Sequence, residues 1–88
     1  MDLILYSKPG CHLCEGLEEK LRSLTDPPLT LEVRDIRTND AWLLAYELEI
    51  PVLCRVTASG QEQPLPRLSP RSGADQIAQM LQKYNKAP

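Results

Sequence analysis

Two cysteines stand three positions apart near the start of the chain, as Cys11 and Cys14 in the run GCHLC. Such a pair can bind zinc, ligate an iron–sulfur cluster, exchange disulfides, or lie in a core without any chemistry. Structural zinc takes four ligands, usually from two such pairs, and iron–sulfur clusters also need more thiolates than one pair supplies. A dithiol that forms and breaks a disulfide needs only two. The spacing therefore favours redox chemistry, and we expect no metal ligand.

Two other residues are candidate metal ligands, His12 and Cys54. His12 lies between the two cysteines, so all three side chains would have to converge from barely one helical turn. An iron–sulfur cluster remains open if two copies of the chain and an external thiol complete the ligand set.

The cysteine pair stands where a strand pattern gives way to a helical one. Residues 3–6 form a short apolar run, typical of a strand buried on both faces. From about residue 11 to 24, leucines recur at steps of three and four, which predicts a helix. Unpaired N–H groups at a helix start stabilise a thiolate. They can lower a cysteine pKa from about 8.5 to about 3.5–7.5.

These positions predict different roles for the two thiols. Cys11 is nearer the helix start and should be the nucleophile, and Lys8 adds positive charge three residues earlier. Cys14 lies one turn further on the same side, where it can attack a mixed disulfide on Cys11. A protonated His12 would help to stabilise the thiolate, or its side chain is simply solvated. Cys54 is expected to be a buried core thiol, with a third redox thiol as the alternative.

The rest of the chain predicts further elements in a regular order. Alternating apolar residues indicate strands over 29–34 and 52–56, and a helix is expected over 38–48 with Pro51 beyond its end. Residues 61–68 form a candidate fourth strand, which two prolines would confine to a sheet edge. Ser72, with Asp75 three residues later, resembles a capping box that opens a last helix. Its apolar face comprises Ile77, Met80, Leu81 and Tyr84.

The predicted order is β-α-β-α-β-β-α. It implies an α/β fold with a four-stranded mixed sheet and helices on both faces. With 88 residues, a single domain over residues 1–88 is expected.

Composition excludes several classes of protein. Apolar residues make up 42 % and charged residues 25 %, as in ordinary folded proteins, and the net charge is −2. There is no basic excess for nucleic acid, no apolar run of the roughly 18 residues that a membrane span needs, and no basic start of a signal peptide. Three cysteines are an odd number for a secreted disulfide framework. We expect a cytoplasmic protein and a monomer.

The segment Tyr6–Cys14, YSKPGCHLC, directly after a hydrophobic strand, resembles the active-site segment of glutaredoxins in the thioredoxin superfamily. Ile50-Pro51-Val52 resembles the T-V-P segment of that family, and Ser72-Gly73-Ala74-Asp75 resembles its G-G-x-D stretch. The predicted element order is also the glutaredoxin order. The likeness spans nearly the whole chain, and is greatest to a short branch with GCHLC and IPVL.

The resemblance implies a thiol–disulfide oxidoreductase with the thioredoxin/glutaredoxin fold and no bound cofactor. It implies a cis peptide before Pro51, with the backbone of Ile50 pairing with an extended thiol peptide. Lys8 would meet a carboxylate of glutathione, with His12 nearby, and Ala74 and Asp75 would hold its γ-glutamyl end. The partners would be glutathione or proteins with disulfides, and a reductase.

Three departures bear on the preference for glutathione and leave the dithiol chemistry intact. The usual C-P-Y-C is C-H-L-C here, Glu49 and Ile50 stand in place of the threonine of T-V-P, and Ser72 replaces the first glycine of G-G-x-D. Arg67 and Arg71 precede the last helix, where they could bind an anion or simply be solvated. The rival class is a binding module that presents the cysteines to a metal, an iron–sulfur cluster or a partner protein without turnover.

Overall fold

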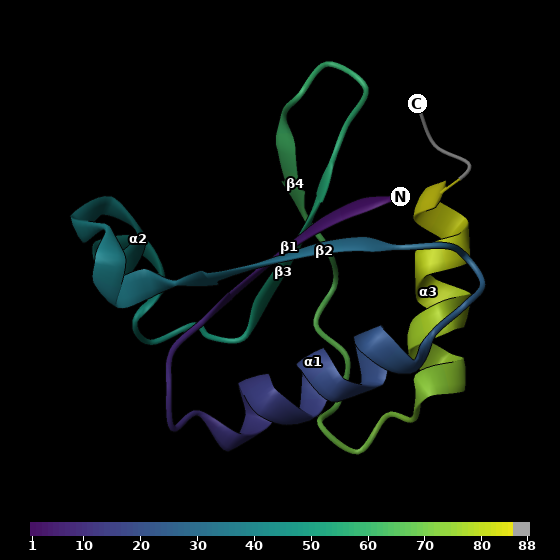
Figure 1. Cartoon of the computed structure of the whole chain (residues 1–88), viewed down its shortest axis with the longest axis horizontal. Helices are drawn as coiled ribbons and strands as arrows, with labels where there is room; N and C mark the ends of the chain where they lie inside the picture. Colours follow the sequence, from purple (N-terminus) through teal and green to yellow (C-terminus); the bar gives the residue numbers. More distant parts are fainter. Residues whose placement is uncertain (86–88) are drawn as a thin grey trace.

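A four-stranded mixed sheet runs through the centre of the computed structural model, which describes residues 1–85 (Figure 1). The strands lie in the order β2-β1-β3-β4. Strand β1 pairs in parallel with β2 and antiparallel with β3, and β3 pairs antiparallel with β4. Their bounds are β1 Asp2–Ser7, β2 Thr30–Asp35, β3 Val52–Val56 and β4 Glu62–Pro64.

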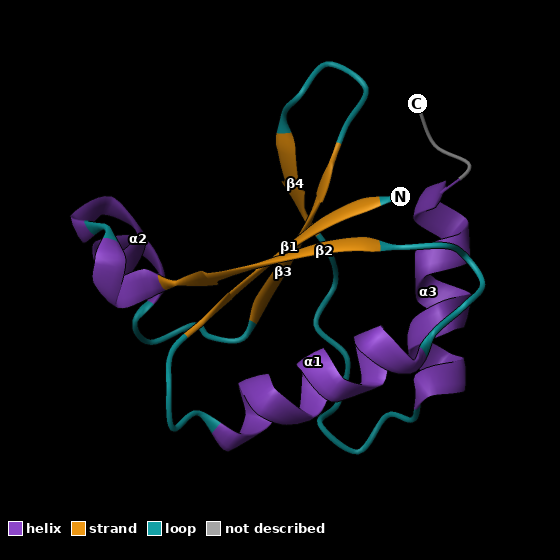
Figure 2. Cartoon of the chain, viewed as in Figure 1, coloured by secondary structure: helices purple, strands orange, loops and turns teal. Residues whose placement is uncertain are grey.

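Within residues 1–85, three α-helices and one 3₁₀ turn connect and cover these strands (Figure 2). The helices are α1 His12–Ser23, α2 Asp40–Tyr46 and α3 Ala74–Asn85, and the 3₁₀ turn is η1 Ile36–Thr38. The order β-α-β-α-β-β-α is therefore confirmed, with η1 as an addition. None of the helices within residues 1–85 has the length and apolar character that a membrane crossing requires.

Strand β1 is central because both of its faces are apolar. Leu3 and Leu5 point to one face of the sheet, and Ile4 and Tyr6 point to the other, as the alternation of a strand requires. All four side chains are buried. The short apolar run at residues 3–6 thus contributes to two separate cores.

The two cores put helices on both faces of the sheet, as predicted. The first core joins β1 and β3 to α1 and α3. Its buried members are Leu3, Leu5, Leu21, Leu53, Leu65, Ile77 and Leu81. The second core lies under α2 and η1, and its buried members are Ile4, Tyr6, Ile36 and Cys54. In Figure 1, α2 lies on the left, apart from α1 and α3 at the bottom and right.

The second helix is shorter than the sequence predicts. It ends at Tyr46, and the side chain of Asn39 caps its start by accepting the N–H groups of Ala41 and Trp42. Of the two apolar pairs four residues apart in this segment, Trp42 and Tyr46 pack on the second core. The other pair, Leu44 and Leu48, is exposed. A four-residue spacing shows that two side chains share a helix face, but not which face is buried.

Two further predictions need correction. The fourth strand covers only Glu62–Pro64, at the sheet edge, since the chain beyond it turns toward α3. Gly73, and not Ser72, precedes α3, and its carbonyl accepts the N–H groups of Gln76 and Ile77. The side chain of Gln76 accepts the N–H of Gly73 in return. The reciprocal capping residue is thus Gln76, one position beyond the predicted Asp75.

Candidate active site at the start of helix α1

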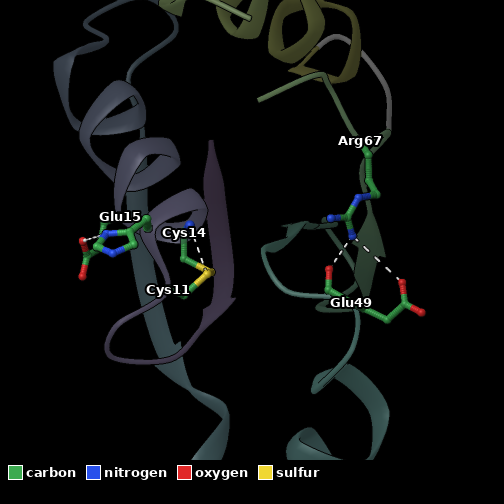
Figure 3. Close-up of a disulfide and its surroundings, with 6 residues drawn as sticks. Cys11, Cys14, Glu15, Glu49 and Arg67 are labelled. Atoms are coloured by element: carbon green, nitrogen blue, oxygen red, sulfur yellow. Dashed lines mark hydrogen bonds and ion pairs between the residues drawn. A yellow bond between two sulfur atoms is a disulfide. The ribbon is translucent and has the colours of Figure 1, made fainter. Parts of the chain in front are cut away.

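Cys11 and Cys14 form a disulfide at the point where the chain enters α1 (Figure 3). Their Cα atoms are 5.3 Å apart. The turn before the helix passes through Gly10, whose φ of 83° is a conformation that side chains disfavour. Cys11 then occupies the N-cap position, and its Sγ accepts the backbone N–H of Cys14 at 3.3 Å. The sulfur of Cys11 therefore takes the place that a capping oxygen usually fills.

The two cysteine residues differ in exposure. Cys14 is only 2 % exposed, whereas Cys11 is partly exposed. An external disulfide or thiol can therefore approach Cys11 more easily, while Cys14 lies within reach of Cys11 itself. This asymmetry supports the predicted division into a nucleophile and a resolving thiol. The roles themselves stay a prediction.

His12 points into solvent beside the disulfide. Its Nδ1 lies 3.6 Å from a carboxylate oxygen of Glu15, and both side chains are exposed. An exposed ion pair of this kind contributes little to stability. Any positive charge on His12 is offset by Glu15, so its effect on the Cys11 thiolate is a weak one.

Lys8 is also exposed. It lines a shallow depression together with the acidic residues Glu15, Glu18 and Asp35. Its backbone carbonyl accepts the N–H of Cys11 at 3.3 Å, which closes the turn before the helix. The structure thus ties the backbone of Lys8 to Cys11 in the turn before the helix. A contact with glutathione stays a prediction.

The Ile50–Pro51 peptide is cis, as the resemblance implies. Pro51 directly precedes β3 and lines a groove together with His12 and Leu13, the two residues between the cysteines. The segment before Pro51 is tied to the loop after β4. The guanidinium of Arg67 donates to the carbonyl of Glu49 and lies 4.0 Å from its carboxylate (Figure 3). Arg67 is therefore already bonded within the chain.

This groove, of about 290 Å³, runs between α1 and the segment that leads from β4 to α3. Apart from His12, Leu13 and Pro51, its lining comprises Gly16, Leu17, Lys20, Leu53, Leu65, Pro66, Arg67, Leu68, Ser69, Pro70, Ser72, Ile77 and Met80. Most of these side chains are apolar, and none of them is acidic. Sequence reasoning missed the groove, because its opposite wall is a stretch without a regular pattern.

Ala74 and Asp75 begin α3, next to the far end of this groove. Lys20 holds the segment before them, since its ammonium group donates to the carbonyls of Pro70 at 3.1 Å and Ser72 at 2.8 Å. Lys20 lies eight residues beyond His12, or about 12 Å along the helix axis. Ala74 and Asp75 do not line the groove. The structure therefore does not bring them to the disulfide, and their role toward glutathione stays a prediction.

Cys54 is remote from this chemistry. It is 1 % exposed, lies opposite Ile4 in the pairing of β1 with β3, and belongs to the core under α2. Burial, with the negative charge of Glu62, raises the pKa of its thiol. The prediction of a buried core cysteine is confirmed. Within residues 1–85, no three His, Cys, Asp or Glu side chains lie together as metal ligands would.

A polar cluster at the edge of the second core was not predicted. The hydroxyl of Tyr6 donates to the carboxylate of Glu62 and accepts from Arg34 at 2.9 Å. The guanidinium of Arg34 also lies 5.0 Å from the ring of Trp42. Burial, together with the bond to Glu62, raises the pKa of Tyr6 to about 12. No local sequence signal marks this cluster, because its members come from three strands and a helix.

Comparison with known proteins agrees with this arrangement. The solved structure of thioredoxin 1 from Thermosipho africanus matches with a TM-score of 0.66, over 98 % of this chain and 96 % of that one. The two sequences are 12 % identical, so this likeness shows the fold alone. No curated protein matches the chain. The family described as Glutaredoxin-like domain (DUF836) matches residues 2–82, which include both cysteines of the pair and Pro51. The chain therefore belongs to this glutaredoxin-like family and has the fold of thioredoxin.

Proposed function

We propose that the protein is a thiol–disulfide oxidoreductase that reduces disulfides or glutathione mixed disulfides with its Cys11–Cys14 pair. One observation carries the proposal. The disulfide stands at the start of α1, with the partly exposed Cys11 as the helix cap and Cys14 buried one turn behind it. Backbone N–H groups at this position stabilise a thiolate on Cys11, and the thiolate is the reactive form of a cysteine.

The reaction begins with both cysteines reduced. The Cys11 thiolate attacks one sulfur of the substrate disulfide, which forms a mixed disulfide and releases the other sulfur as a thiolate that takes up a proton. Cys14, losing its own proton, then attacks the Cys11 sulfur and releases the second substrate thiol. The substrate has gained two electrons and two protons, and the protein holds the Cys11–Cys14 disulfide.

Regeneration returns two electrons to the protein. Two molecules of glutathione supply them and leave as glutathione disulfide, or a reductase supplies them directly. Membership of a glutaredoxin-like family supports the glutathione route. For that route we propose glutathione contacts at Lys8, His12, Ile50 and Pro51, with its γ-glutamyl end at Ala74 and Asp75, and a monomer in the reducing cytoplasm.

Turnover of a glutathione mixed disulfide tests the proposal. The purified protein is supplied with glutathione, glutathione reductase and NADPH, and NADPH oxidation is followed. Cys11→Ser should reduce the rate to that without protein, since no thiolate remains at the helix cap. Cys14→Ser should retain reactions that need one thiol, and lose the reduction of a protein disulfide.

Two outcomes would contradict the proposal. Undiminished turnover by Cys11→Ser would show that the nucleophile is another group. Absence of turnover on glutathione mixed disulfides, small disulfides and protein disulfides alike would favour a binding module. Metal content and visible absorption of freshly purified protein then test for an iron–sulfur cluster shared by two chains.

A further inference from the structure

We propose that the groove beside the cysteines binds an apolar side chain of a peptide substrate, so that the protein prefers peptide disulfides with large apolar residues near the cysteine. This inference rests on the proposed function and names its substrate class. The groove starts at His12 and Leu13, between the two cysteines, and at Pro51. A substrate joined to Cys11 therefore has this groove next to it.

The lining of the groove suits an apolar occupant. Leu17, Leu53 and Ile77 are among its walls, and none of the lining residues, all within the described part of the chain, is acidic. Leu13 is 54 % exposed and Leu68 is 38 % exposed, so apolar surface is available beside the reactive pair. Burial of such surface by a ligand is favourable at about 25 cal/mol per Å².

The two cations of the lining are already engaged. Lys20 donates to the carbonyls of Pro70 and Ser72, and Arg67 bonds to Glu49. A small, highly charged ligand such as glutathione would have to compete with these bonds for its carboxylates. An apolar side chain can bind without breaking these hydrogen bonds, which favours it as the occupant.

Gly16 gives independent support. It lies inside α1, where a glycine costs about 1 kcal/mol relative to alanine, and it lines the groove. A Cβ built on Gly16 would meet no neighbouring atom within 4 Å. Packing within the protein therefore does not require this glycine. Its absent side chain leaves room in the groove, which is where an external ligand would lie.

The dimensions limit where the apolar residue stands in the substrate. The groove follows α1 from His12 to Lys20, about 12 Å along the helix axis. An extended peptide covers about 3.3 Å per residue. The apolar side chain should thus lie within about three or four residues of the reacting cysteine.

Single-turnover reduction by the reduced protein tests the inference without any reductase. The substrates are two symmetrical disulfides of one short peptide, with either leucines or serines at the positions flanking its cysteine. Glutathione disulfide and bis(2-hydroxyethyl) disulfide are compared with them, and all rates are divided by those with dithiothreitol. We expect the leucine peptide to react about tenfold faster than the serine peptide, as a filled apolar pocket typically discriminates.

Variants of groove residues test whether the preference for the leucine peptide depends on the groove. Gly16→Leu fills the groove and should bring the ratio of leucine to serine rates close to one. Leu68→Ser, on the opposite wall, should lower the ratio severalfold, and it keeps the test valid if Gly16→Leu does not fold. Ala45→Leu is the matched control, because Ala45 is an exposed small residue of α2 on the other face of the sheet. It should keep the wild-type ratio.

The outcomes separate this inference from the proposed function. Equal rates for the two peptides, or a faster reaction with glutathione disulfide than with the leucine peptide, would overturn the inference while the oxidoreductase activity stands. A preference that survives both groove variants would place the apolar site elsewhere and also overturn it. If no disulfide is reduced, bis(2-hydroxyethyl) disulfide included, the proposed function fails and the inference with it.

Discussion

The three cysteines of this chain lie in two regions with opposite properties. Cys11 and Cys14 stand at the start of α1, where the backbone N–H of Cys14 donates to the Cys11 sulfur and solvent reaches Cys11. Cys54 lies inside β3, where burial raises the pKa of its thiol. The same functional group is thus partly exposed at a helix start in one region, and buried with a raised pKa in the other. Backbone position and access decide which thiol is reactive.

Packing separates the same two regions. The core around Cys54 is filled with aromatic rings, and the centroid of Tyr6 lies 4.4 Å from Tyr46 and 5.7 Å from Trp42. The region beside Cys11 keeps a groove of about 290 Å³ with a glycine in its wall. A groove open to solvent has room for a larger side chain, whereas a filled core does not. We therefore expect that a larger side chain is tolerated beside Cys11, or even raises the unfolding free energy there, but not in the core around Cys54.

The largest expected contrast is in thiol alkylation. After reduction, Cys11 should react with iodoacetamide at pH 7 on the order of a thousandfold faster than Cys54, since Cys54 is both buried and largely protonated. Mass spectrometry of peptides over time measures each site. In guanidinium chloride the rates at the two cysteines should converge. Equal rates in the folded protein would remove the distinction between the two regions.

The unfolding free energy of the protein should depend on pH in the alkaline range, because of Tyr6 in the core around Cys54. The pKa of Tyr6 is about 12 in the folded protein against about 10 ordinarily. The folded state therefore keeps a proton that the unfolded state releases. Its stabilising contribution is complete below about pH 10 and falls by up to about 1.4 kcal/mol per pH unit between pH 10 and 12.

Tyr6→Phe isolates this effect. The variant loses the hydroxyl bonds to Glu62 and Arg34, and should be less stable than the wild type near pH 8. Urea unfolding at several pH values should show the two proteins converging as pH approaches 12. A difference in unfolding free energy that is constant with pH would show that Tyr6 titrates normally.

Cys54→Ser should affect the two regions differently, because it changes the core around Cys54 and leaves the Cys11–Cys14 pair intact. The substitution places a hydroxyl among apolar and aromatic side chains. Burying it there without a hydrogen bond should lower the unfolding free energy by about 1–3 kcal/mol. Disulfide exchange through Cys11 should stay within about twofold of the wild type. Cys54→Ala, which adds no polar group, is the control. Loss of exchange in a folded Cys54→Ser protein would mean that Cys54 takes part in the chemistry.

Much of the fold was predictable because its signals are local. The unbroken run at residues 3–6, the leucine spacing of α1 and the alternation around Cys54 each follow from periodicity. The dithiol was predictable for the same reason, since both cysteines and the helix start lie within a few residues. Resemblance added the cis peptide before Pro51, for which local reasoning gives only a low base rate.

The parts that could not be predicted depend on residues far apart in the chain. The groove joins α1 to the irregular segment from β4 to α3, and the bond from Arg67 to Glu49 spans 18 residues. The capping of α3 by Gly73 and Gln76 was missed because Ser72 and Asp75 offered the same pattern one position earlier. Competing local patterns and long-range contacts are both decided by tertiary packing.

Gly16 gives the smallest and most direct test of the difference between the two regions. Gly16→Ala should raise the unfolding free energy by about 0.5–1 kcal/mol, because alanine favours the helix and its Cβ meets no neighbouring atom within 4 Å. Denaturant unfolding of the reduced protein measures this gain. If the glycine serves the substrate, the same change should lower the rate with the leucine peptide more than with bis(2-hydroxyethyl) disulfide. A gain in stability with no change in either rate would instead show that Gly16 contributes neither to packing among residues 1–85 nor to substrate binding.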